Sequence, residues 1–157
     1  MKQDKFLTGI LIGIGVLILL ALGLFFTRQD KREYIADTTP EGVVHNYVLA
    51  ILNKDYEKAY AYLADLEDKP TYEDFRQSFF NGMVNPNDTG VDFGTAEINK
   101  DEAVVTLTLF YSYSDPFSSG YQSIDRALLV DQNGDWKLSS MPYNFWDYNW
   151  YQEPVKP

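Results

Sequence analysis

His45 is the only histidine of this sequence, and histidine is the residue type whose charge usually changes near neutral pH. Histidine is also the most frequent general acid or base in enzymes, so any such chemistry would use this residue. It precedes Tyr47 in a run whose apolar residues recur at helical spacing. Two interpretations are open: His45 and Tyr47 line a ligand pocket, or His45 is a surface or boundary residue of its helix. No partner acid or nucleophile is identifiable, so we predict no catalytic residue and favour the surface or boundary position.

A run of oxygen-bearing side chains occurs at Asp131-Gln132-Asn133-Gly134-Asp135, where alternate positions could coordinate a hard cation such as calcium. In a calcium loop glycine follows the third ligand, but here Trp136 occupies that place and no glutamate closes the loop. The Asn-Gly pair favours a tight hairpin turn instead. The sequence has no cysteine, which excludes disulfides and thiolate metal sites. We therefore predict no metal and no cofactor.

Aromatic residues are concentrated near the C-terminus, with six of them in residues 143–151. Large exposed apolar patches are rare, so this segment either packs over its own domain as a lid or meets a partner. Tyrosine and tryptophan beside polar residues are typical of protein interfaces. The candidate partner-binding residues are Tyr143, Phe145, Trp146, Tyr148, Trp150 and Tyr151.

Charge is distributed unevenly along the chain. Residues 1–33 carry five lysines and arginines against three acids, so the remainder has a formal charge of −12, against −10 for the whole chain. Binding to nucleic-acid phosphates or anionic lipids depends on basic side chains. Such an acidic remainder excludes nucleic acid as a partner.

Residues 6–26 form a run without charges in which Thr8 is the only polar side chain. As a helix it would span about 30 Å, the thickness of the hydrocarbon core of a bilayer. A cleaved signal peptide is the alternative, since Ala21-Leu22-Gly23 has small residues at cleavage-site spacing, but the run is longer than the usual h-region. We predict a retained single-pass transmembrane helix. Gly9 and Gly13 have the spacing that lets two such helices pack as a homodimer.

The remaining sequence predicts three helices followed by two β-hairpins. Helices are expected at 40–53, 55–66 and 71–81, with Thr39, Asp55 and Thr71 as their capping residues. Strands are expected at 95–99 and 103–113, then at 121–130 and 135–141 across the Asn-Gly turn.

The predicted parts are an N-terminal tail 1–5, a transmembrane helix 6–26, a juxtamembrane linker 27–38, a domain 39–142 and an aromatic tail 143–157. Two segments carry a resemblance: Asp55-Tyr56-Glu57-Lys58-Ala59-Tyr60 in the second helix and Asn133-Gly134-Asp135-Trp136-Lys137-Leu138 entering the last strand. With three helices before antiparallel strands, residues 39–141 resemble the NTF2-like (cystatin-like) superfamily. The resemblance implies an α+β domain with a helical layer packed on a curved antiparallel sheet. It implies no particular activity, because enzymes, ligand binders and structural members share these features.

We therefore expect a non-catalytic, membrane-anchored NTF2-like module that docks a partner protein or membrane complex at the cell envelope, with its domain extracytoplasmic. The alternative is an isomerase-like or cyclase-like enzyme, or a carrier, with a pocket for a small hydrophobic ligand at His45 and Tyr47. A deep apolar cavity at these residues would favour the alternative, and a filled interior would favour docking.

Overall fold

The computed structural model of the chain describes residues 5–27, 33–87, 89–111 and 120–152, with residues 5–7 and 25–27 described by their backbone alone. The chain divides into two compact units, Met1–Arg32 and Glu33–Pro157. Residues 1–4 of the predicted tail, 28–32 of the predicted linker, the end of the predicted strand 103–113 and residues 153–157 lie outside the described residues.

The described residues of the first unit form one helix of 23 residues, α1 (Lys5–Thr27). Within the described part of the chain, the structure holds no helix that is sufficiently long and apolar to cross a membrane. The prediction that residues 6–26 are helical is thus confirmed, whereas their predicted transmembrane character is not.

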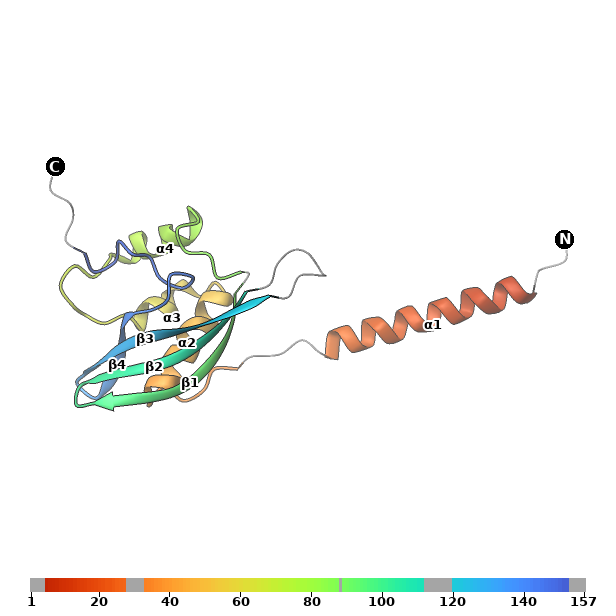
Figure 1. Cartoon of the computed structure of the whole chain (residues 1–157). Helices are drawn as coiled ribbons and strands as arrows, with labels where there is room; N and C mark the ends of the chain where they lie inside the picture. Colours follow the sequence, from red (N-terminus) through yellow and green to blue (C-terminus); the bar gives the residue numbers. More distant parts are fainter. Residues whose placement is uncertain (1–4, 28–32, 88, 112–119, 153–157) are drawn as a thin grey trace. The chain divides into compact units, whose positions relative to one another are not determined.

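The second unit begins with three helices, α2 (Pro40–Leu52), α3 (Tyr56–Ala61) and α4 (Tyr72–Phe80). Each starts at a predicted cap: the side chains of Thr39, Asp55 and Thr71 accept hydrogen bonds from backbone N–H groups of the first turn. These bonds satisfy donors that have no partner inside the helix. Figure 1 shows the helices on one side of the sheet, the arrangement of an α+β fold.

Four antiparallel strands follow in the order β1-β2-β3-β4. They are β1 (Thr89–Asn99), β2 (Glu102–Tyr111), β3 (Tyr121–Gln132) and β4 (Asp135–Ser140). The predicted Asn-Gly turn is confirmed, because Asn133 and Gly134 both have positive φ and the Asp131 carboxylate accepts from the Gly134 N–H at 2.7 Å. A bulge interrupts β1 between Phe93 and Ala96.

The core lies between α2 and the sheet. Alternate residues of β2 point inward, and Val105, Leu107 and Leu109 are completely buried, as the period of two predicts. Tyr47 and Val44 of α2 are completely buried against this face.

The predicted helix 55–66 is wrong in its length, because α3 ends at Ala61. The next residues pair with the sheet: Ala64 N–H donates to the Leu138 carbonyl, and Leu138 N–H donates to the Tyr62 carbonyl, both at 2.8 Å. Residues 62–64 therefore cover the edge of β4, which would otherwise present unpaired backbone groups. The predicted strand 95–99 is also wrong in its length, because β1 begins at Thr89.

Residues 33–38, which the sequence assigned to the linker, belong to the second unit together with Thr39. The buried Asn46 side chain fastens them: its Oδ1 accepts from the Ile35 N–H at 2.9 Å, and its Nδ2 donates to the Ile35 carbonyl at 2.8 Å. The Ala36 carbonyl lies so close to Gly42 that a Cβ at that position would stand 2.1 Å away. We call residues 33–39 the N-terminal strap.

Replacing Asn46 with alanine should release this strap, since it removes two hydrogen bonds and leaves backbone groups of Ile35 unpaired. We expect the free energy of unfolding to fall by about 1–3 kcal/mol and amide exchange at residues 33–39 to accelerate, measured by urea denaturation and hydrogen–deuterium exchange. Asn99→Ala, at an exposed strand end, is the matched control and should change neither quantity appreciably. Unchanged exchange in Asn46→Ala would show that something else holds the strap.

Candidate functional site

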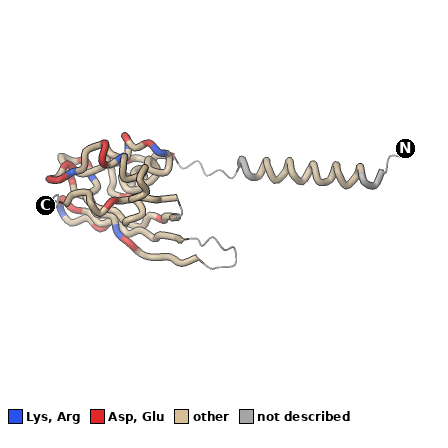
Figure 2. The backbone as a smooth tube through the Cα atoms, turned by 90° about the horizontal axis from the view of Figure 1, so that it is seen from above, with Lys and Arg blue, Asp and Glu red and all other residues tan. Residues whose placement is uncertain are grey.

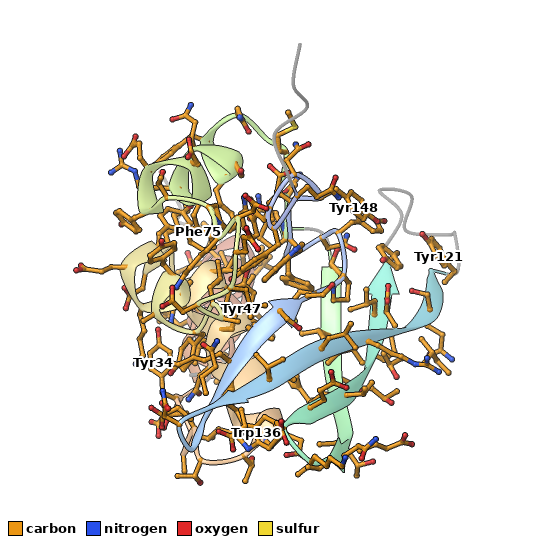
Figure 3. All side chains as sticks on the ribbon, turned by 90° about the vertical axis from the view of Figure 1, so that its left-hand side faces the viewer. Tyr34, Tyr47, Phe75, Tyr121, Trp136 and Tyr148 are labelled. Atoms are coloured by element: carbon orange, nitrogen blue, oxygen red, sulfur yellow. The ribbon has the colours of Figure 1, made fainter. Side chains whose placement is uncertain are left out.

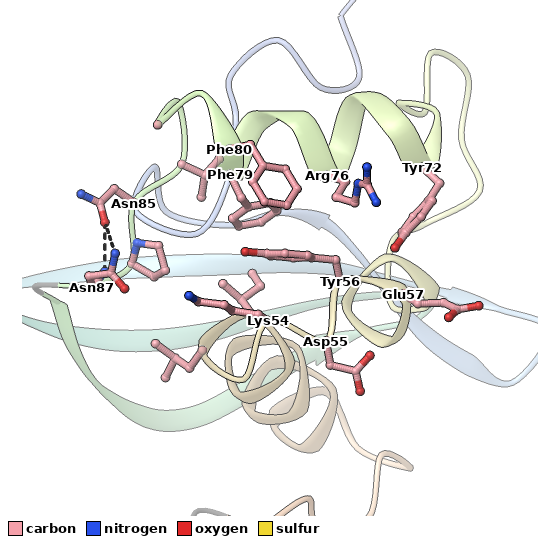
Figure 4. A pocket seen from close by; sticks show the side chains of 15 residues that line it. Lys54, Asp55, Tyr56, Glu57, Tyr72, Arg76, Phe79, Phe80, Asn85 and Asn87 are labelled. Carbon is pink, nitrogen blue, oxygen red and sulfur yellow. Dashed lines mark hydrogen bonds between the residues drawn. The ribbon is translucent and has the colours of Figure 1, made fainter.

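A surface groove of about 800 Å3 lies between the start of α3 and α4, with loop 82–87 at one end (Figure 4). We name it the α3–α4 groove. Its walls carry four aromatic rings and two cations: Tyr56, Tyr72, Phe79, Phe80, Lys54 and Arg76.

The spacing of α4 explains why one of its faces lines the groove. Tyr72, Arg76, Phe79 and Phe80 stand at i, i+4, i+7 and i+8, which places them on one side of the helix. Phe75 and Ser78 face the other way and are buried. Thus the outer face of α4 is aromatic, and its inner face is packed against the rest of the unit.

The rings of the groove are ordered by stacking. The Tyr56 ring stacks on Phe79 with centroids 4.9 Å apart and meets the edge of Phe80 at 5.8 Å. Offset and edge-on contacts of this kind stabilise aromatic pairs. Nevertheless Phe80 remains 64% exposed, so a large apolar surface is left uncovered.

Arg76 brings a positive charge to this wall. Its guanidinium lies 5.4 Å from the centre of the Phe80 ring, and its terminal nitrogen is 3.4 Å from a carboxylate oxygen of Glu73. That ion pair is solvent-exposed and therefore weak. The Nε–H group is buried without a hydrogen-bond partner, which is costly for a donor on a charged group.

The groove also has a second cation, Lys54, and two carboxylates, Asp55 and Glu57. Residues 33–157 contain eight lysines and arginines against 21 acids, and Figure 2 shows the excess of acidic positions. Asp55 already accepts from the Lys58 N–H as the cap of α3, and in Figure 4 its carboxylate and that of Glu57 point away from the rings. Lys54 and Arg76 balance the two acids that line the groove, so the groove is less acidic than the unit as a whole.

The predicted pocket at His45 and Tyr47 is not formed by the groove, which neither residue lines. The half-buried His45 ring packs edge-on against Phe93 at 5.1 Å, with its Nδ1 3.3 Å from Asn46 Oδ1. Tyr47 lies in the interior of the unit and is fully buried (Figure 3). Its hydroxyl donates to the Phe145 carbonyl at 2.8 Å. His45 therefore lies at the edge of the core and Tyr47 within it, and the ligand pocket at these residues stays a prediction.

The C-terminal aromatic segment folds back on the unit, as the lid interpretation described. Phe145, Trp146 and Trp150 are at most 5% exposed, so they are core residues and present no docking surface. Tyr143 and Tyr148 are 48% and 71% exposed, and Tyr151 is half-buried with its hydroxyl donating to the Ala64 carbonyl. Of the predicted partner-binding residues, only Tyr143 and Tyr148 are sufficiently exposed to contact a partner.

A buried polar network anchors this segment to α4. The Ser78 hydroxyl donates to Asp147 Oδ2 at 2.7 Å and accepts from the Trp150 ring N–H at 3.3 Å. Asp147 Oδ1 accepts from the backbone and side chain of Asn149, both at 2.9 Å. Because the only histidine of the chain lies elsewhere, on α2, this serine and carboxylate lack an imidazole base. We assign the network a structural role.

No cluster of three potential metal ligands occurs among the residues that the structure describes. The five residues from Asp131 to Asp135 form the hairpin turn described above. Gly9 and Gly13 lie in α1, where a Cβ added at either position would meet nothing within 4 Å apart from its chain neighbours and the surrounding helix backbone. The predicted dimerisation through these glycines therefore stays a prediction.

The sequence interpretation missed the α3–α4 groove. The helical pattern identifies Tyr56 only as an apolar residue, and Arg76 belongs to no motif. A signal was present in the spacing of Tyr72, Arg76, Phe79 and Phe80, which places four large side chains on one helical face. What the sequence could not reveal is that this face is turned outward.

No family model matches this chain, and no curated protein matches it in sequence. Among solved structures, a SEC-C motif containing protein from Rhodopseudomonas palustris is 11% identical, with a TM-score of 0.49 over 68% of this chain and 79% of that one. A protein of unknown function with a cystatin-like fold from Nostoc punctiforme is 18% identical, with a TM-score of 0.44 over 61% and 80%. An uncharacterized cystatin fold protein from Novosphingobium aromaticivorans is 9% identical, with a TM-score of 0.39 over 62% and 92%.

At such identities and TM-scores these likenesses carry no argument about function. The predicted α+β class is confirmed by the elements of the chain itself, a helical layer on a four-stranded antiparallel sheet, which is consistent with a cystatin-like fold.

Trp150→Ala should destabilise the second unit by about 3–5 kcal/mol, because it empties a buried aromatic site between α4 and the core. Tyr148→Ala, two residues away and exposed, should cost no more than about 0.5 kcal/mol. Urea unfolding of the full chain in detergent micelles, followed by circular dichroism, measures both. Equal effects would contradict the assignment of Trp150 to the core.

Burial raises the pKa of the Tyr47 hydroxyl well above its ordinary value, with nearby Tyr151 adding to the effect. The unfolded chain therefore loses this proton first, so stability is intact below about pH 10 and falls as the pH rises further. Tyr47→Phe should lower stability at pH 7 by about 1 kcal/mol through the lost hydrogen bond, yet make the loss above pH 10 shallower. If the free energy of unfolding fell equally steeply above pH 10 in both proteins, the burial of the Tyr47 hydroxyl would be contradicted.

Proposed function

We propose that this chain is a non-catalytic, membrane-tethered NTF2-like module that docks a partner protein at the cell envelope through the α3–α4 groove. The observation that carries the proposal is that this groove is open and lined by aromatic rings, whereas the interior at Tyr47 is filled by its own C-terminal segment.

Docking is favoured over catalysis by the chemistry of the described residues. His45 contacts an amide and an aromatic ring, and no acid or nucleophile is described in contact with it. Exposed aromatic residues next to an arginine, in contrast, have the composition of interface hot spots. No specific observation favours the alternative of an isomerase-like or cyclase-like enzyme, or a carrier of a small hydrophobic ligand.

The tether rests on the sequence of residues 6–26 and on the exposure of α1. Its apolar side chains from Ile10 to Leu24 are 43–69% exposed, and they surround the helix. A helix that is apolar on all sides requires an apolar environment. The side chains described, 8–24, correspond to about 25 Å of helix, and the uncharged run of residues 6–26 extends this to about 30 Å, the thickness of a bilayer core.

We place the second unit outside the cytoplasm, since long domains can be translocated regardless of their charge. The tether would raise the concentration of the unit near envelope partners, so a modest affinity for each would be sufficient. The excess of acids would repel anionic lipid surfaces and so favour a protein partner.

Membrane tethering predicts that the full chain stays in the membrane pellet after extraction with alkaline carbonate. A variant that lacks residues 6–26 should appear in the supernatant, because it has lost the apolar helix. Release of the full-length chain by carbonate, or recovery of a mature chain without its first two dozen residues, would contradict the tether.

Docking through the groove is tested by photocrosslinking in intact membranes. A photoreactive phenylalanine analogue at Phe80, which is exposed in the groove, should give a discrete heavier product. The same analogue at Ile124, which is 77% exposed on β3 outside the groove, is the matched control and should give none. Equal products at both positions, or none at Phe80, would contradict docking through this surface.

A further inference from the structure

The chemistry of the α3–α4 groove narrows the class of partner that it can accept. The Arg76 guanidinium is held near the Phe80 ring, and its Nε–H has no acceptor. The Nε–H is buried, but the Arg76 side chain is 42% exposed, so its terminal nitrogens can pair with the carboxylate of a ligand. The weak contact with Glu73, at 3.4 Å and exposed, can be exchanged for a better one.

The charges around the groove point to the same ligand chemistry. Lys54 at the other side supplies a second cation, while the carboxylates of Asp55 and Glu57 are directed away from the rings (Figure 4). The unit has 21 acids and eight basic residues, whereas the groove is lined by two cations and by two acids whose carboxylates point away from the rings. The groove is therefore the part of this acidic surface that can accept a carboxylate beside the rings.

The rings define the rest of the ligand. Tyr56, Phe79 and Phe80 form a stacked floor and wall on which a proline or another apolar side chain can pack. The Asn85 and Asn87 side chains, hydrogen-bonded to each other at 2.9 Å, line the end of the groove and offer polar atoms to a peptide backbone. These features fit an extended peptide better than a compact ion.

We propose that the α3–α4 groove binds an extended segment of a partner protein in which a carboxylate pairs with Arg76 and a neighbouring proline or apolar side chain packs against Tyr56 and Phe80. This inference rests on the proposed docking function and adds the chemistry of the partner segment. Anionic membrane lipids are a competing class of ligand, and the acidic surface of the unit disfavours them.

The test uses the full chain in phosphatidylcholine nanodiscs to select a random dodecapeptide phage library. The enriched peptides should share an aspartate or glutamate near a proline or apolar residue. Their synthetic versions, followed by fluorescence anisotropy, should bind about tenfold or more weakly to Arg76→Gln, because one charge-assisted contact is lost. Arg126→Gln removes an exposed arginine of β3 outside the groove and is the matched control, expected to bind as the wild type does.

Phe80→Ala separates this inference from the proposed function. Loss of binding in Phe80→Ala together with Arg76→Gln supports both. Loss in Phe80→Ala alone, or enrichment of peptides without an acid, overturns the carboxylate pairing and leaves groove docking intact. Binding that neither substitution weakens, or a library without enriched peptides, overturns both. Binding of vesicles with phosphatidylglycerol that depends on Arg76, in place of peptide binding, would assign the groove to lipid and overturn the inference.

Discussion

The contact of Trp150 with Phe75, with ring centroids 4.8 Å apart, is the interaction on which the candidate site depends. The nine residues of α4 are too few to be a stable helix alone, so this helix requires tertiary contacts. Its two buried side chains both meet the C-terminal segment, Phe75 through Trp150 and Ser78 through Asp147. The groove wall therefore depends on contacts between the inner face of α4 and a segment some 70 residues later in the chain.

This arrangement divides the aromatic residues of the chain between two roles. Trp146 and Trp150 close the core, and their burial leaves Tyr56, Phe79 and Phe80 as a continuous extension of the same stack toward solvent. At the opposite end of the unit's sequence, Asn46 fixes the N-terminal strap on α2. Both ends of the folded unit are thus tied to its core, and a rigid unit loses less conformational entropy when it binds a partner.

Much of the fold follows from local sequence patterns. The caps at Thr39, Asp55 and Thr71, the alternation in β2 and the Asn-Gly turn depend on neighbouring residues, and each prediction agrees with the structure. The length of α3 and the extent of β1 depend on pairing with distant strands, which periodicity does not contain. The candidate site was missed for the same reason. Only the packing of α4 decides that Arg76 and Phe80 face solvent while Trp150 is buried. The composition of residues 143–151 alone had suggested that Trp150 is exposed and binds a partner.

The central claim, that the α3–α4 groove is covered by a partner in the cell, is tested most directly by hydrogen–deuterium exchange of the full chain in native membranes and after purification into nanodiscs. The account predicts that amides of α4 and loop 82–87 exchange more slowly in native membranes, and that purification removes this protection while exchange in β2 stays the same. Equal exchange of α4 and the loop in both preparations, or protection confined to the exposed face of β3, would contradict it.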